Sequence, residues 1–329
     1  MNSRMKDRGR KIRFCAKIFL ISCMLGLAFS GSGAAFDYPS RAIQVVIGYA
    51  PGGPASLGAR IVSEEVSKEI GVPLVIINKP GGQGSIAATF VARSKPDGYT
   101  LLAGTSANLS AAFALLPDIT YKLSDFMPIA QHIVHPLALA VRNDAPWKSL
   151  REFVEDARQN PGKYKASSDG GGIALCLEAL LQSSNIKVPH MLCKGAAPNL
   201  QALLGGETQF SAISLPSLLP QLEAGKVRLL AISGRLKQFP NTPSIAEMGY
   251  TDVSRDFWNG FFAPAGTPQP VFEKLSQVFK KTITSPSTVA KLEKAGFIAT
   301  YRDPKEFNDY LQREYEIWVK LGKQYKISE

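Results

Sequence analysis

Short apolar runs alternate with amphipathic segments along most of the chain. Runs rich in β-branched residues predict buried strands over 41–50, 72–78, 99–104, 133–141, 165–168, 188–193, 209–214, 227–233 and 259–263. Between them, apolar residues at helical spacing predict helices over 55–70, 85–93, 150–159, 173–183, 197–204, 217–223, 245–248, 270–284 and 304–325. This alternation predicts an α/β fold with mainly parallel sheets and flanking helices.

The number of strand–helix units exceeds what one sheet of ordinary size holds. We therefore expect two α/β lobes with a cleft between them. Ligands of open α/β sheets bind at the carboxyl ends of the strands, where loops lead into helix N-termini.

The first 35 residues differ from the rest. Seven basic residues and one acidic residue occur there, followed by an apolar stretch over 18–29 and small residues over 31–35. This order is typical of a secretory signal peptide, with cleavage expected after Ala35. An uncleaved anchor is an alternative, although about 12 apolar residues are too few to span a bilayer. A lipoprotein processed at Cys23 is another.

Removal of this leader changes the charge. The full chain has 38 basic and 27 acidic residues, a net charge of +11. The remaining 31 basic and 26 acidic residues give a net charge of only +5. A charge of this size does not indicate nucleic acid or a membrane surface as a partner. The hydrophobic content of 45% excludes general disorder, and the lack of an apolar run of 18 residues excludes a multi-span membrane protein.

Four glycine-rich joints connect predicted strands to predicted helices, over 49–56, 78–84, 104–108 and 167–172. Each presents backbone N–H groups at a helix start, which suits a carboxylate or phosphate. Ordinary turn and cap chemistry is the alternative for any single joint. The stretch 82–87 also satisfies G-x-G-x-x-A, but the next strand ends in Gly104-Thr105 instead of an acidic residue, which disfavours a dinucleotide site.

Residues for catalysis or metal binding are sparse. The chain has three histidines, His132, His135 and His190. The first two are three apart in a predicted strand and so point to opposite faces. No G-x-S-x-G or H-E-x-x-H motif occurs. Nothing in these residues points to an enzyme, a metal site or a cofactor, although a secreted enzyme with a metal-free cleft remains an alternative.

Short motifs follow one another in a recognisable order across the mature chain. They are Tyr38-Pro39-Ser40-Arg41, Pro51-Gly52-Gly53, Ala59-Arg60, Asn78-Lys79-Pro80-Gly81, 96–102, Lys194-Gly195, 203–206, 218–220, 224–228, 243–247 and 262–268. In this order and spacing the chain resembles the periplasmic substrate-binding receptors of tripartite tricarboxylate transporters, the Bug-type receptors.

The resemblance implies a two-lobed Venus-flytrap periplasmic binding protein of type II-like architecture. Such a receptor captures a small organic carboxylate in the periplasm and delivers it to a membrane permease. We expect residues 36–135 and 260–329 to form the first lobe and residues 136–259 the second. We also expect a monomer that binds no nucleic acid. A receptor that serves a signalling partner instead of a permease is a further alternative.

The resemblance also implies the ligand contacts, carried over by position. They are Tyr49, Ala50, Pro51, Gly52, Gly53, Thr105, Ser106, Ser168, Gly170, Gly171, Gly172, Lys194, Gly195, Ala196, Ser214 and Trp258. For Lys194 the alternative is a solvated surface charge, and for Trp258 it is packing at the hinge.

Several positions depart from the family pattern. The first loop of the family usually reads Gly-Gly-x-Thr-Asp before the helix, whereas here it reads Gly53-Pro54-Ala55-Ser56; the acid available to a ligand ammonium is missing, which disfavours amino-acid ligands. Cys193 replaces the usual tyrosine before Lys194-Gly195, and Gln209-Phe210 replaces a usual acid, so we expect a larger or more apolar cleft. Cys176 and Cys193 both follow cleft loops; they either form a disulfide or are two buried thiols.

Overall fold

The computed structural model describes residues 38–116 and 118–325. The predicted leader lies outside the described residues. Residues 41–329 form one compact unit, and the arrangement below is that of its described part. No helix in this part is long and apolar enough to cross a membrane.

Ten strands of the described chain run in the order β2-β1-β3-β9-β4-β7-β5-β6, with β8 and β10 also paired to β4. The strands are β1 (Ile43–Ile47), β2 (Leu74–Asn78), β3 (Thr100–Thr105), β4 (Phe126–Arg142), β5 (Ala166–Ser168), β6 (His190–Leu192), β7 (Phe210–Ser214), β8 (Val227–Ile232), β9 (Asp256–Pro264) and β10 (Ile298–Arg302).

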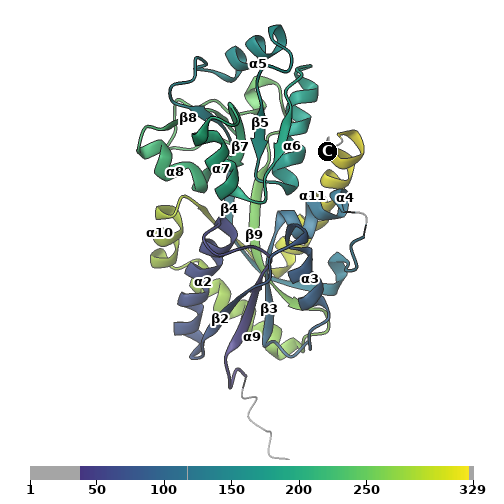
Figure 1. The fold of residues 1–329 in the computed structure, drawn as a ribbon. Helices are drawn as coiled ribbons and strands as arrows, with labels where there is room; N and C mark the ends of the chain where they lie inside the picture. Colours follow the sequence, from purple (N-terminus) through teal and green to yellow (C-terminus); the bar gives the residue numbers. More distant parts are fainter. Residues whose placement is uncertain (1–37, 117, 326–329) are drawn as a thin grey trace, which may run out of the picture. The chain divides into compact units, whose positions relative to one another are not determined.

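Helices cover both faces of these strands (Figure 1). They are α2 (Pro54–Ile70), α3 (Ser85–Ala92), α4 (Ala112–Leu115), α5 (Leu150–Gln159), α6 (Gly171–Ser183), α7 (Ala196–Gly205), α8 (Leu215–Glu223), α9 (Gln269–Ile283), α10 (Pro286–Lys294) and α11 (Pro304–Gln324). Short turns of helix are η1 (Gly82–Gly84), η2 (Ala107–Ala111), η3 (Leu123–Asp125) and η4 (Ala246–Met248).

The strand β4 belongs to two sheets. Up to Pro136 it pairs with β9, and from Leu137 onward it pairs with β7 and β8. We call the first sheet with α2, α3, α9 and α10 the first lobe, and the second sheet with α5 to α8 the second lobe (Figure 1). One continuous strand therefore connects the two lobes.

The pairing is mixed. The outer strands are parallel, β1 with β2 and β3 in the first lobe and β5 with β6 and β7 in the second. Pairs that involve β4 or β9 are antiparallel. The expected parallel pairing thus holds for the outer strands, whereas the long strand between the lobes and the strand beside it impose antiparallel pairs.

Each lobe has an aromatic core. In the second lobe, Phe153 and Phe210 stack with ring centroids 4.3 Å apart. In the first lobe, Trp258 packs edge to face on Phe307 at 5.1 Å. The helix α11 contributes to both cores, because Phe307 belongs to the first and Trp318 to the second. The C-terminal helix therefore does not pack on the first lobe alone.

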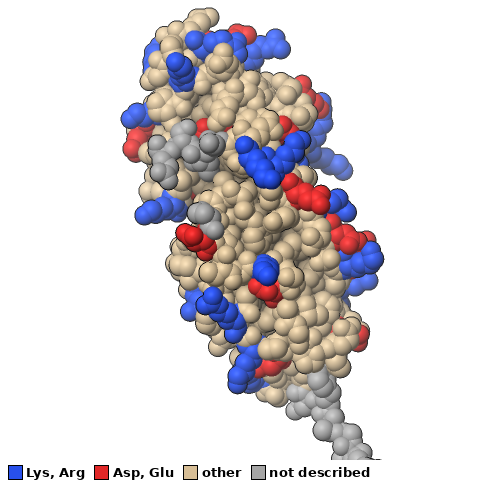
Figure 2. Space-filling view, turned by 90° about the vertical axis from the view of Figure 1, so that its right-hand side faces the viewer, with Lys and Arg blue, Asp and Glu red and all other residues tan. Residues whose placement is uncertain are grey.

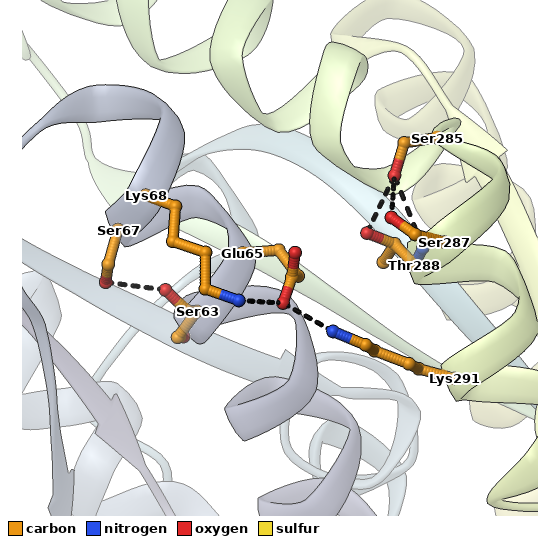
Figure 3. A network of polar contacts seen from close by, with 8 residues as sticks. All are labelled: Ser63, Glu65, Ser67, Lys68, Ser285, Ser287, Thr288 and Lys291. Carbon is orange, nitrogen blue, oxygen red and sulfur yellow. Dashed lines mark hydrogen bonds and ion pairs between the residues drawn. The ribbon is translucent and has the colours of Figure 1, made fainter.

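Charged side chains of both signs lie interspersed on the face shown in Figure 2. Elsewhere, one ionic cluster ties α10 to α2 (Figure 3). The Glu65 carboxylate accepts hydrogen bonds from Lys68 Nζ at 2.6 Å and from Lys291 Nζ at 2.7 Å. At the start of α10, Ser285 Oγ accepts the backbone N–H of Thr288 at 3.3 Å and caps the helix.

Candidate functional site

The first-lobe side of the candidate site is organised around Tyr49, which follows β1. Its hydroxyl donates to the Gln83 carbonyl at 2.9 Å and lies 3.1 Å from Thr105 Oγ1. Burial raises the pKa of Tyr49 to about 12. The Tyr49 carbonyl accepts from Asn78 Nδ2 at 2.7 Å. The first three predicted joints are therefore held together by direct hydrogen bonds.

The end of β3 is fixed by an exchange of hydrogen bonds between Thr105 and Asn108. Asn108 Oδ1 accepts the backbone N–H of Thr105 at 2.8 Å, and Thr105 Oγ1 accepts the backbone N–H of Asn108 at 3.3 Å. The carbonyl of Asn108 accepts from the hydroxyl of Tyr121. Thr105 and Ser106 are both buried, at the carboxyl end of the strand where the site was predicted.

In the second lobe, Ser168 ends β5 and lies in a chain of three side chains. Ser168 Oγ is 2.8 Å from His190 Nε2, and His190 Nδ1 is 2.7 Å from Glu178 Oε1. All three side chains are nearly fully buried. Sequence reasoning placed Ser168 at the site but did not connect it to Glu178 or His190, which are 10 and 22 positions away.

Asp169 was missed as an organising residue. Its carboxylate accepts from Asn199 Nδ2 at 2.7 Å and from the backbone N–H of Ser214 at 3.0 Å. It thereby joins the ends of β5 and β7 to α7, and Ser214 Oγ in turn lies 2.8 Å from His135 Nδ1. Burial raises the pKa of Asp169 to about 7. In the sequence, only the adjacent glycines indicated that this turn has a role beyond connecting a strand to a helix.

The glycines after Asp169 bring the two lobes together. Gly170 and Gly171 have φ values of +90° and +56°, which favour glycine. A Cβ on Gly171 would lie 3.4 Å from Ala107 Cβ and 3.4 Å from Gln83 Oε1, both in the first lobe. The second, third and fourth predicted joints therefore meet at one place, between the lobes.

Helix starts in this protein differ in how they are capped, and α3, α8 and α9 have neither a side-chain cap nor an acid in the first turn. The N-caps of α2, α6 and α7 are Gly53, Gly170 and Gly195, without a side-chain cap hydrogen bond and without an acid in the first turn. By contrast α5, α10 and α11 are capped by their own Ser149, Ser285 and Asp303. The first group leaves its first N–H groups to another acceptor.

Other predicted site residues lie in different surroundings. Lys194 is exposed in the loop before α7. Trp258 is completely buried among Phe262, Phe307 and Tyr310, which supports the packing alternative.

Of the two alternatives for Cys176 and Cys193, the structure has the pair of free buried thiols. Cys176 belongs to the apolar core of the second lobe, whereas Cys193 Sγ lies beside the Met191 carbonyl.

In the described part of the chain, two of the cavities lie away from these joints. One, of about 440 Å³, is lined by Thr300, Tyr301, Arg302, Glu306, Asp309 and Arg313. The other, of about 370 Å³, is lined by residues 162, 178, 181, 182 and 186–190 on α6 and the segment that leads into β6. Among the described residues, no group of three His, Cys, Asp or Glu side chains could hold a metal ion.

A family model described as the tripartite tricarboxylate transporter family receptor matches residues 58–326. This chain belongs to that family. Protein BugT of Bordetella pertussis is 28% identical over 313 residues, which are 93% of this chain and 95% of BugT. The predicted family is thereby confirmed, and the family is one of solute-binding receptors.

Solved structures of similar proteins have the same fold. The receptor resembles MatC from Rhodopseudomonas palustris with bound malate (29% identity, TM-score 0.79, covering 87% of this chain and all of that one). It also resembles an R. palustris protein solved with adipate, with 28% identity and a TM-score of 0.82 over 87% of this chain and 98% of that one. Periplasmic binding protein BugD is 28% identical, with a TM-score of 0.80 over 88% of this chain and 99% of that one. The predicted two-lobed periplasmic binding protein fold is confirmed.

Proposed function

We propose that this receptor binds a small organic carboxylate between its lobes and delivers it to a tripartite permease in the membrane. The observation that carries the proposal is the set of three helices, α2, α6 and α7, whose glycine N-caps leave backbone N–H groups without a side-chain acceptor. Such helix starts favour a small anion, either a carboxylate or a phosphate. The malate and adipate held by two similar structures support this ligand class.

The carboxylate is held chiefly by these backbone donors, with the hydroxyls of Thr105 and Ser168 at its sides. In the usual receptor pattern an acid at the start of α2 is available to a ligand ammonium, whereas here Pro54-Ala55-Ser56 occupies that turn. The first turn of α2 contains no acid. We therefore expect plain carboxylates to bind in preference to amino acids.

Calorimetry and thermal shift against a carboxylate panel test this proposal. Malate, adipate and succinate are compared with aspartate, glutamate and the uncharged diamide of succinate. Saturable binding of at least one plain acid, raised Tm and no turnover are expected. Binding restricted to the amino acids or the diamide would contradict the ligand class, and product formation would favour the secreted enzyme.

Export and assembly form a second part of the proposal. We expect the mature chain to begin at Phe36, to be periplasmic and to be monomeric. Mass spectrometry of protein recovered from its source gives the N-terminus, and light scattering gives the mass in solution. A lipid on Cys23 would contradict the processing, and recovery with a signalling protein instead of a permease would contradict the transport partner.

A further inference from the structure

The Ser168–His190–Glu178 chain links the candidate site to the outer side of the second lobe. At its inner end, Ser168 precedes the Asp169–Gly172 turn that meets the first lobe. At its outer end, Glu178 and His190 line the cavity of about 370 Å³. A buried ionisable pair thus lies between a predicted ligand contact and a cavity open to solvent.

With Glu178 taken as ionised, the hydrogen bonds of this chain are consistent with one arrangement of its protons. An ionised carboxylate only accepts, so His190 Nδ1 must carry the proton that faces Glu178 Oε1. In a neutral imidazole, Nε2 then has a lone pair and must accept the hydroxyl proton of Ser168. In this state Ser168 turns its only proton away from the cleft, and a ligand carboxylate would meet oxygen lone pairs.

A proton added at His190 Nε2 reverses this arrangement. The imidazolium N–H donates to Ser168 Oγ, and the Ser168 hydroxyl is released to donate to an anion. The imidazolium then stands between two negative groups, the Glu178 carboxylate and the ligand. Hydrogen bonds with an ionised partner are the stronger ones. The bond from the imidazolium to Ser168 Oγ needs only the added proton, whereas the bond from the Ser168 hydroxyl to the ligand needs the proton and the anion together.

We propose that the Ser168–His190–Glu178 chain couples ligand binding to the uptake of one proton, which reaches His190 through the outer cavity. The inference rests on the proposed function, since the ligand must be an anion. Coupling of two binding events is reciprocal, so the carboxylate favours the protonated chain as much as the proton favours the carboxylate.

Other titratable and charged groups surround His190. From α6, Glu178 makes a hydrogen bond to it and the polar Gln182 lines the same cavity, and Lys187 precedes β6 at the cavity wall. Asp169 follows Ser168 in the neighbouring strand, and Cys193 follows β6. Asp169 is the competing proton acceptor, because it too is buried at the site and its contacts are Asn199 and Ser214.

The tautomer of His190 in the ligand-free protein is the first test. The chain has three histidines, so ¹⁵N-histidine NMR spectra are simple, and a His190→Gln variant assigns the signal. We expect the Nδ1–H tautomer before ligand is added and an imidazolium with both nitrogens protonated at saturation. An Nε2–H tautomer without ligand, or a neutral ring with ligand, would overturn the proposal.

Calorimetry measures the coupling directly. Malate or adipate, whichever binds more tightly, is titrated in buffers of different ionisation enthalpy between pH 6 and pH 8. We expect uptake of close to one proton at the alkaline end and an affinity that weakens by up to about tenfold per pH unit. Saturable binding without proton uptake would overturn only this inference. Absence of binding by both acids would contradict the proposed function and the coupling with it.

Two variants separate the chain from its surroundings. Glu178→Gln keeps the shape but removes the charge that stabilises the imidazolium, so proton uptake and pH dependence should largely disappear. Glu155→Gln on α5 removes an exposed carboxylate from the same lobe and should retain both. Proton uptake that persists in Glu178→Gln and in His190→Gln would assign it to Asp169 and refute the proposal.

Discussion

At the scale of single residues, Gly172 shows how closely the helix start of α6 is packed. A Cβ at this position would lie 2.7 Å from Trp318 Cη2 and 3.0 Å from Phe257 Cε1. Neither ring can move without disturbing the core of the second lobe. We expect Gly172→Ala to lower the free energy of unfolding by about 1–3 kcal/mol in urea titrations.

Gly205 provides the matched control for this substitution. It lies in α7, and a Cβ there would meet nothing within 4 Å. Gly205→Ala should be neutral or should stabilise by about 0.5–1 kcal/mol, since alanine favours a helix. Equal effects of the two substitutions would show that the contact with Trp318 and Phe257 does not decide the outcome.

The buried His132 gives the receptor a defined response to acid. Burial lowers the pKa of His132 from 6.5 to about 3. Between pH 6.5 and pH 3, His132 is protonated in the unfolded chain but stays neutral in the folded chain. The free energy of unfolding therefore decreases as the pH falls toward 3. At pH 5 this loss is about 2 kcal/mol from His132 alone.

Replacement of His132 by leucine tests whether this histidine causes a loss of stability at low pH. Urea titrations of the wild type and His132→Leu at pH 7 and pH 5 are compared, and we expect the variant to lose about 2 kcal/mol less stability between the two values. The difference between pH values is the readout, because the substitution also changes packing against Phe261. An identical loss in both proteins would contradict a buried neutral His132.

At the scale of elements, the contact between α2 and α10 rests partly on Glu65 (Figure 3). The Lys291 and Lys68 ammonium groups lower the pKa of the Glu65 carboxyl below 4.5, so this contribution is present at neutral pH and is lost in strong acid. Both lysine side chains are at least half exposed, and solvent screens such pairs.

A double-mutant cycle with Glu65→Gln and Lys291→Gln measures the pair. We expect a coupling energy below about 1 kcal/mol, which decreases in high salt. Glu64→Gln, an exposed neighbour on α2, serves as the control and should not couple to Lys291. A coupling energy of several kcal/mol that does not change with salt concentration would show that the pair is effectively buried.

The elements with strong periodicity could be predicted from sequence, whereas partly buried ones could not. The helix over 150–159 was predicted with its exact bounds, because Ser149 caps it and its apolar face is regular. The strand β10 was missed because all five of its residues are only partly buried, which leaves no alternating pattern. The strand β4 was predicted to begin too late, since the polar Gln131 and His132 precede the apolar run over 133–141 and the pairing with β9 is irregular there.

The candidate site was predictable only as loops. Glycines mark the turns in the sequence, so the joints at Gly53 and Gly170 could be identified as helix starts, whereas Gly195 was named only through the family resemblance. The side-chain partners could not, because Glu178 and His190 reach Ser168 from elements whose packing no local pattern specifies. Asp169 resembled an ordinary turn residue until the structure showed its contacts with Asn199 and Ser214.

At the scale of the whole molecule, three elements link the lobes. The strand β4 pairs in both sheets, β9 runs beside it, and α11 contributes to both aromatic cores. Beside α11, Gly171 of the second lobe faces Ala107 of the first. We expect the lobes to open at this contact, with β4, β9 and α11 as the hinge, and to close over the ligand.

A bulky side chain at the contact between the lobes tests closure. Ala107→Trp places an indole where only 3.4 Å separates Ala107 Cβ from the Cβ position of Gly171, so the lobes cannot meet. With a saturating carboxylate, the radius of gyration from X-ray scattering should fall for the wild type but not for Ala107→Trp. The Kd of the variant should rise at least about tenfold, because an open cleft leaves the ligand solvated.

Ala224→Trp, at an exposed position after α8, controls for the added bulk and should close as the wild type does. Unchanged affinity and the same decrease in radius for Ala107→Trp would mean that the ligand is held without closure at this contact.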